Sequence, residues 1–185
     1  MTPIEAGPAE DSRLEFQHPG KRSMNAPFVL KIDGEVERPI QLTFSDLAEI
    51  DQSFQVVDVS RIDPQRQGDA VTLNGVLQLV GVKSTARYLG LHAAQDDFHA
   101  SVPLEPIRDR AFFIYRVAGQ ALSDKQGGPI RFYIPDFAEC HTDEVDECAN
   151  VKFVDHVEFT AERGFDNRPE DDQEHADLHD RSDSQ

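Results

Sequence analysis

Residues 127–132 read Gly-Gly-Pro-Ile-Arg-Phe, and residues 150–154 read Asn-Val-Lys-Phe-Val. A Gly-Gly-Pro turn allows another group to approach the backbone closely, because glycine has no Cβ. Arg131 then offers a planar guanidinium, which suits a phosphate or a ring carbonyl. The plainer interpretation is that Gly-Gly-Pro is only a turn, while Arg131 and Lys152 are exposed ends of strands. The two segments therefore predict strands joined by a tight turn, with an anion site as the functional interpretation.

Short apolar runs surround these two segments and are separated by frequent turn residues. The pattern predicts short helices at residues 43–47, 73–82 and 104–108, the second of them capped by Asn74. Strands are predicted at residues 28–33, 54–59, 85–91, 99–102, 111–117, 130–134 and 151–160. Because strands dominate and helices are few, we expect an α+β fold with a mixed, mainly β core.

The two ends of the chain differ in composition from the middle. Residues 1–27 are rich in Pro, Gly, Ser and charge, which predicts a flexible N-terminal arm. Residues 164–185 are rich in Asp, Glu and His and poor in large apolar residues, which predicts a disordered acidic tail. We expect that tail to increase solubility, with metal scavenging by His175 and His179 as the alternative. The folded domain is therefore expected at residues 28–163.

The net charge limits the classes of partner. The chain carries 35 acidic and 18 basic residues, for a formal net charge of −17. Such a field repels nucleic acid and anionic membranes, so we expect a small-molecule, metal or basic protein partner instead. There is no apolar run of the roughly 18 residues that span a bilayer, and the first residues lack the features of a signal peptide. A cytoplasmic location follows as the expectation, and the oligomeric state is not predicted.

Further segments complete an ordered pattern with the two quoted first. They are Phe28–Pro39, Leu42–Leu47, Asn74–Val80, Phe98–Leu104 and Ala118–Leu122. Taken in order, this set resembles the molybdopterin-binding domain of the sulfite oxidase family. The resemblance implies that family's fold, a molybdopterin cofactor and an oxidoreductase role. It also places four residues at cofactor-contacting positions: Gln126, Arg131, Asn150 and Lys152.

One departure from the family pattern concerns the metal. The family holds its molybdenum with one cysteine, but here the matching segment, residues 56–62, contains none, and the ligand position falls on Val59. Asp58 and Ser60 beside it offer oxygen atoms only. Sulfite-type oxygen-atom transfer is therefore not expected, and whether the chain is an enzyme stays open. The alternative is a non-enzymatic binding domain on the same fold.

The only two cysteines lie in an acidic loop. Cys140, His141 and Cys148 fall within nine residues of one another, and thiolates with an imidazole suit zinc or iron. The spacing differs from the usual short zinc-binding patterns, so three interpretations stay open. They are a Cys140/His141/Cys148 metal site, a local disulfide or redox pair, and inert cysteines in a surface loop. Elsewhere, we interpret His92, His99 and His156 as structural or surface histidines.

Overall fold

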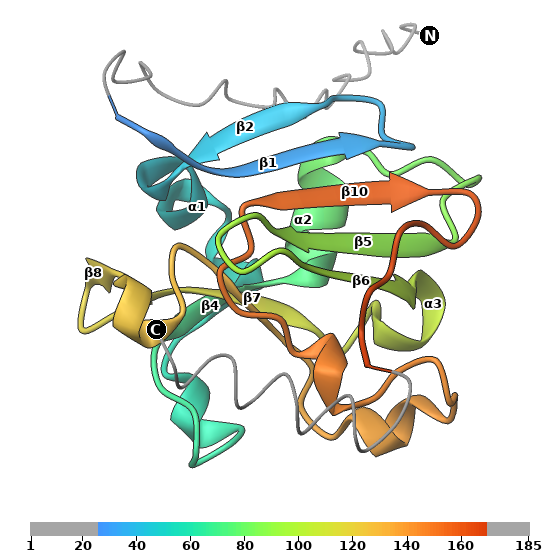
Figure 1. Cartoon of the computed structure of the whole chain (residues 1–185). Coiled ribbons are helices and arrows are strands. Elements are labelled where there is room, and N and C mark those ends of the chain that lie inside the picture. The colour runs from blue at the N-terminus through green and yellow to red at the C-terminus, as the bar shows by residue number, and fades with distance from the viewer. Residues whose placement is uncertain (1–25, 170–185) are drawn as a thin grey trace, which may run out of the picture.

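The computed structural model describes residues 26–169 and contains two five-stranded sheets (Figure 1). The first, which we call the β10 sheet, has the strand order β2-β1-β10-β5-β6. The second, the β7 sheet, has the order β3-β4-β7-β8, with β9 also paired to β7. The expected α+β class with a mixed, mainly β core is confirmed.

The strands and helices are short throughout. The strands of the β10 sheet are β1 (Phe28–Gly34), β2 (Ile40–Thr43), β5 (Tyr88–Ala93), β6 (Phe98–Pro103) and β10 (His156–Thr160). The strands of the β7 sheet are β3 (Gln55–Val56), β4 (Asp69–Thr72), β7 (Phe112–Val117), β8 (Gln120–Ala121) and β9 (Arg131–Tyr133). The α-helices are α1 (Phe44–Glu49), α2 (Leu73–Val80) and α3 (Leu104–Ile107). Single 3-10 turns lie at η1 (Gln52–Phe54), η2 (Val59–Arg61), η3 (Asp124–Gln126), η4 (Phe137–Cys140) and η5 (Glu147–Ala149).

A parallel pair joins the two ends of the domain. β1 pairs with β10 in parallel, whereas the other paired strands of the described residues run antiparallel. Because the last strand lies between β1 and β5, the first strand joins the rest of its sheet only when the last one is in place. The fold therefore depends on contacts that are distant in sequence.

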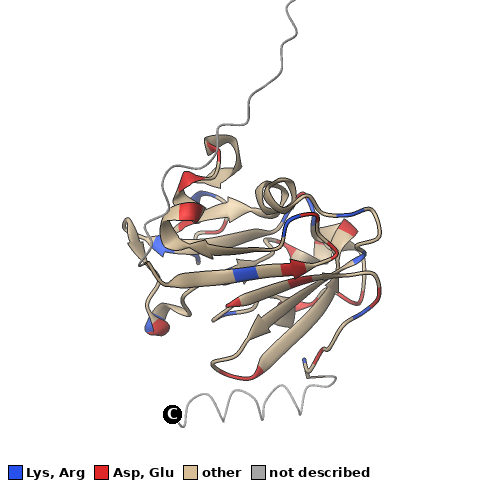
Figure 2. Cartoon of the chain, turned by 90° about the horizontal axis from the view of Figure 1, so that it is seen from above, with Lys and Arg blue, Asp and Glu red and all other residues tan. Residues whose placement is uncertain are grey.

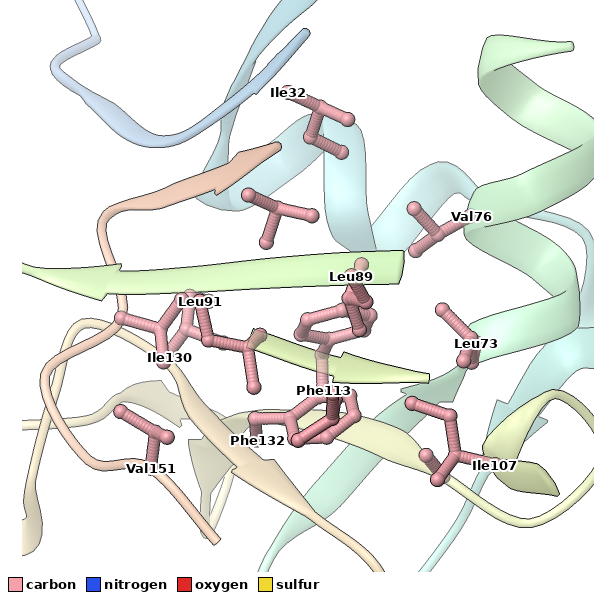
Figure 3. Packing of buried hydrophobic residues seen from close by; sticks show 14 of the residues in the cluster. Ile32, Leu73, Val76, Leu89, Leu91, Ile107, Phe113, Ile130, Phe132 and Val151 are labelled. Carbon is pink, nitrogen blue, oxygen red and sulfur yellow. The ribbon is translucent and has the colours of Figure 1, made fainter. Parts of the chain in front are cut away.

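The main hydrophobic core lies between the two sheets and α2. Figure 3 shows Leu73 and Val76 of α2 pointing toward Leu89 of β5. Below them, the rings of Phe113 and Phe132 pack with centroids 5.0 Å apart. These five side chains are fully or almost fully buried, so the helix and both sheets share a single core.

Local chemistry explains where the helices begin. The sequence offers Thr43 or Ser45 as the cap of α1, and in the structure Thr43 caps it with a capping box to Asp46. The expected cap of α2 was wrong, because the Thr72 hydroxyl accepts from the Gly75 amide while Asn74 lies inside the helix. The strand expected at residues 54–59 is also shorter, since the chain turns at Asp58, which has a positive φ of 62°.

The chain after β10 packs back onto the domain. We call residues 163–168 the C-terminal clasp, and Figure 1 shows this part running from β10 past β6 toward the short helices at residues 137–149. The Asn167 amide donates to the His99 carbonyl over 3.0 Å, and the Gly164 amide donates to the Ser101 hydroxyl over 2.9 Å. The described contacts thus extend beyond residue 163, where we expected the domain to end. Residues 170–185 of the expected tail and residues 1–25 of the expected arm lie outside the described residues.

A buried ion pair fastens this clasp. Arg168 and Asp166 pair at 2.8 Å with side chains only 6% and 7% exposed, and Arg168 also reaches Asp146 at 3.0 Å. Burial opposes the ionisation of Asp166, but hydrogen bonds from Arg168 and Arg163 outweigh it and lower its pKa to about 2. The clasp therefore joins the edge strand β6 to the acidic loop.

The helices of residues 26–169 are all too short or too polar to cross a bilayer.

Candidate functional site

Arg131 and Lys152, which the sequence singled out, lie on either side of Gly127. A Cβ added at Gly127 would lie 3.2 Å from the Lys152 Cβ and 3.3 Å from the Arg131 Cδ. Gly127 has a φ of 79°, a conformation that glycine adopts without strain. The turn therefore brings the cationic side chain of Arg131, from β9, and that of Lys152 to one stretch of backbone, as an anion site requires. Lys152 lies in the bend before β10, because the strand expected at residues 151–160 begins only at His156.

The environment of Arg131 is cationic and dehydrated. Its side chain is half-buried, and burial first, then the nearby charge of Arg66, lower its pKa. Within residues 26–169 the charged groups that act on Arg131 are Arg66 and Tyr133, and no carboxylate is among them. A second arginine close to an unpaired one raises the local potential, so the site favours a bound anion.

Arg66 is a member of this site that the sequence did not reveal. Its Nε is buried without a hydrogen-bond partner among the described residues, since the nearest carboxylate oxygen, of Asp63, is 3.7 Å away. The Arg66 guanidinium lies over the ring of Tyr133, 5.0 Å from its centroid, and the Tyr133 hydroxyl donates to Asp63. In the sequence Arg66 is one charge in a polar loop. Only the pairing of both β4 and β9 with β7 brings this loop near Arg131.

Two of the four predicted cofactor contacts have structural roles in this conformation. Gln126 closes the capping box of η3, accepting from the Ser123 amide and hydroxyl at 3.0 and 2.9 Å. The Asn150 Oδ1 accepts from the Ile134 amide at 2.7 Å. Both side chains thus hold the loops that flank Arg131 and Lys152, and whether they also contact a ligand stays a prediction.

The predicted metal position is closed and apolar. Val59 is fully buried in a small cluster separate from the main core. The other buried members of this cluster are Ala70, Phe112, Ile114, Leu122 and Tyr133. Of the two neighbouring oxygen groups, the Ser60 hydroxyl donates to the Asp58 carboxylate, so the pair is already satisfied. The residues around position 59 suit hydrocarbon packing and do not fit a molybdenum ion.

In this conformation the acidic loop does not bring the predicted ligands Cys140, His141 and Cys148 together around one point. Cys140 is buried, Cys148 is half-buried, and both are free thiols. No group of three or more His, Cys, Asp or Glu side chains among residues 26–169 is arranged to hold a metal ion. Burial raises the pKa of both thiols, with a further increase at Cys148 from Asp146. A thiol with a raised pKa is a weak nucleophile and a weak metal ligand at neutral pH, which favours inert cysteines.

Charge on the surface of the domain is mostly acidic. Figure 2 shows Asp and Glu spread over several strands and loops, with basic residues between them. Against this background, the cluster of Arg66, Arg131 and Lys152 is a local exception. The contrast would draw a small anion to this place in preference to the rest of the surface.

Comparison with known proteins shows the family of the chain. Residues 69–167, just over half of the chain, match the family model described as the oxidoreductase molybdopterin binding domain. This segment runs from β4 through the clasp and includes Arg131 and Lys152. No curated protein matches the sequence.

Among solved structures, the fold is similar to the sulfane dehydrogenase SoxCD from Paracoccus pantotrophus. The TM-score is 0.53 and the sequences are 21% identical, over 74% of this chain and 39% of that chain. At this identity the likeness supports the fold alone. The chain described above spans well under half of the length of that relative.

Proposed function

Because the chain belongs to the family of oxidoreductase molybdopterin-binding domains, we propose that it binds a molybdopterin-type cofactor through Arg131, Lys152 and Arg66. In this proposal the domain lacks the usual catalysis of sulfite oxidases. When complete, the cofactor would supply oxygen-atom transfer at its metal. The residues of this chain bind and orient its anionic part.

The Arg131 guanidinium carries this proposal. Among residues 26–169, the half-buried Arg131 has no carboxylate partner and the Arg66 Nε has no hydrogen bond, so both side chains gain from a further acceptor. A phosphate or a pterin carbonyl would supply the missing acceptors, and an arginine fork suits both. Because Gly127 has no side chain, Arg131 and Lys152 can approach its backbone closely and act on one ligand together.

A second candidate is a non-enzymatic binding domain that holds another anion in the same pocket. The fully buried Val59 favours it, because a valine offers no donor atom to molybdenum. The two candidates share the cationic pocket and differ in what fills it. Chemical identification of the bound molecule distinguishes them.

Replacement of Arg131 tests the pocket. We expect Arg131→Ala, purified from a host that makes the cofactor, to lose at least about tenfold of the pterin that the wild-type chain retains. The reason is that a charge-assisted contact to a buried anion is worth about 1.5 to 3 kcal/mol. Pterin is measured by its fluorescence after oxidative release, and molybdenum by elemental analysis of the same sample.

The matched control is Arg38→Ala, which removes an exposed arginine whose contact is the Gln78 carbonyl. It should leave pterin retention unchanged. Equal retention by the Arg131→Ala and wild-type chains would overturn the assignment. A wild-type chain with another anion and no pterin would establish the non-enzymatic candidate instead.

A further inference from the structure

Three histidines form a row across three adjacent strands. His156 of β10, His92 of β5 and His99 of β6 are direct partners in the register of the sheet. Side chains alternate between the faces of a strand, so the row lies opposite the face on which Leu91 and Val157 enter the core. The rings of His92 and His99 have centroids 5.1 Å apart, and those of His92 and His156 are 5.0 Å apart.

The central contact joins two ring nitrogens of the same kind. The Nδ1 atoms of His92 and His99 are 2.9 Å apart, so one of them donates and the other accepts. The His99 Nε2 lies 3.3 Å from an Asp97 carboxylate oxygen, which accepts its proton. In a neutral His99 the Nδ1 is then the acceptor, and His92 is the donor. The His92 Nε2, which is 3.7 Å from Glu158, can receive one further proton without breaking this bond.

A second added proton would have to bind the His99 Nδ1, which is the acceptor of the hydrogen bond from His92. With both rings charged, two Nδ1–H groups would face one another at hydrogen-bond distance, and the two charges would repel. The side chains are only 16% and 19% exposed, so water screens this repulsion poorly. Burial first, then the charges of His156 and His99, lower the pKa of His92, which agrees with this crowding.

The groups that surround the pair include both signs of charge. β10 contributes His156 and Glu158, and β1 contributes Lys31 and Asp33, which bonds His156 over 2.6 Å. The turn between β5 and β6 and the segment before β10 contribute Asp96, Asp97 and Asp155. Burial raises the pKa of Asp96. None of these groups lies between the two Nδ1 atoms, so they do not relieve the clash of a doubly charged pair.

The ring of His99, the acceptor in the pair, also contacts the C-terminal clasp. The Phe165 ring packs beside His99, with centroids 5.0 Å apart. The His99 amide donates to the Asn167 side chain over 2.7 Å, and the Asn167 amide returns a bond to the His99 carbonyl. A turn of the His99 ring away from His92 would therefore disturb the contacts that hold residues 164–167 on β6.

We propose that His92 and His99 form a proton-binding pair that releases the C-terminal clasp from β6 when both rings become charged. The closed clasp tolerates at most one added proton on the pair, whereas the open one accepts two. The sign follows from linkage. The closed clasp binds fewer protons on the pair than the open one, so it is fully favoured above the ordinary histidine value of about 6.5 and loses that advantage as the pH falls. The lowered pKa of His92 has the direction that this requires.

Hydrogen exchange of the full chain tests the proposal. We expect protection of the Gly164 and Asn167 amides, corrected for intrinsic exchange, to fall by up to about tenfold per pH unit below about pH 6.5, as one-proton linkage requires. Amides of β5 serve as the internal reference for global stability. Asp166 does not explain such a loss, because its pKa of about 2 keeps it ionised in this range.

The variant that isolates the effect is His99→Asn, whose amide lies near the Nδ1 position and takes no proton. Its clasp protection should stay constant over the same pH range, while His141→Asn, which replaces an exposed histidine outside the row, should behave as wild type. If His99→Asn does not fold, His92→Asn gives the same test. Protection that persists in the wild type, or that falls equally in the Asn variant, would overturn the proposal.

Discussion

Gly34→Ala is expected to destabilise the domain by at least about 4 kcal/mol, an effect at the upper end for single substitutions. Gly34 ends β1 with a φ of 87°, and a Cβ there would lie 2.1 Å from the Phe159 carbonyl oxygen. That oxygen belongs to the backbone of β10 and accepts from the Glu35 amide over 2.7 Å. The clash therefore cannot be relieved by a side-chain rotation, and it separates the one parallel strand pair of the described residues.

A second glycine provides the control for backbone strain. Gly119 has a similar φ of 75°, but nothing lies within 4 Å of a Cβ added there. Gly119→Ala should cost only about 1 to 2 kcal/mol, the cost of the left-handed conformation itself. Urea unfolding of both variants measures the difference. Similar losses in the two would contradict the claim that close approach of β1 to β10 holds this sheet together.

The sequence predicts the elements of this fold better than their pairing. Short apolar runs place β1 and β7 correctly, and Thr43 or Ser45 marks the start of α1. The parallel contact between β1 and β10 has no local signal, because its residues are more than a hundred positions apart in the chain. The cap of α2 was missed for a different reason: Thr72 and Asn74 are both good caps, and only the backbone decides which one lies at the end.

The candidate site shows the same division. Arg131 and Lys152 were found because they belong to quoted motifs, and the structure places both beside Gly127. Arg66 was missed because its loop carries no motif. The histidine row was missed because the register of three strands brings these residues together, while their spacing in the sequence does not indicate that they are neighbours. Side chains that act together across a sheet are visible only once the strands are paired.

The clasp also changes how the acidic end of the chain is understood. Composition alone treats residues 164–169 as part of a solvated tail, since charged residues dominate there. In the structure Asp166 and Arg168 form a buried ion pair, and Arg168 also contacts Asp146. A few specific ionic contacts can therefore order a segment that has little apolar surface of its own, provided that each buried charge has a partner.

Val59→Cys is expected to raise the molybdenum content of the purified chain from near zero toward one atom per bound pterin. Valine and cysteine are similar in size, so the substitution keeps the packing against Leu122 and Tyr133 while it adds the thiol that the family uses at this position. Elemental analysis and pterin fluorescence of the same sample give the ratio.

Val59→Ala is the matched control, because it opens space at the same position without adding a donor atom. It should leave molybdenum near zero and lower stability through the lost packing, by about 1 to 3 kcal/mol. If the cysteine variant keeps its pterin but gains no metal, the missing thiolate is not what separates this chain from a catalytic domain. If it gains metal, the buried valine is the reason that this chain lacks the chemistry although it keeps the fold and the cationic cluster. If the wild type, Val59→Cys and Val59→Ala all lack pterin, the result counts against pterin binding by Arg131. The claim about Val59 can therefore fail independently of the claim about Arg131.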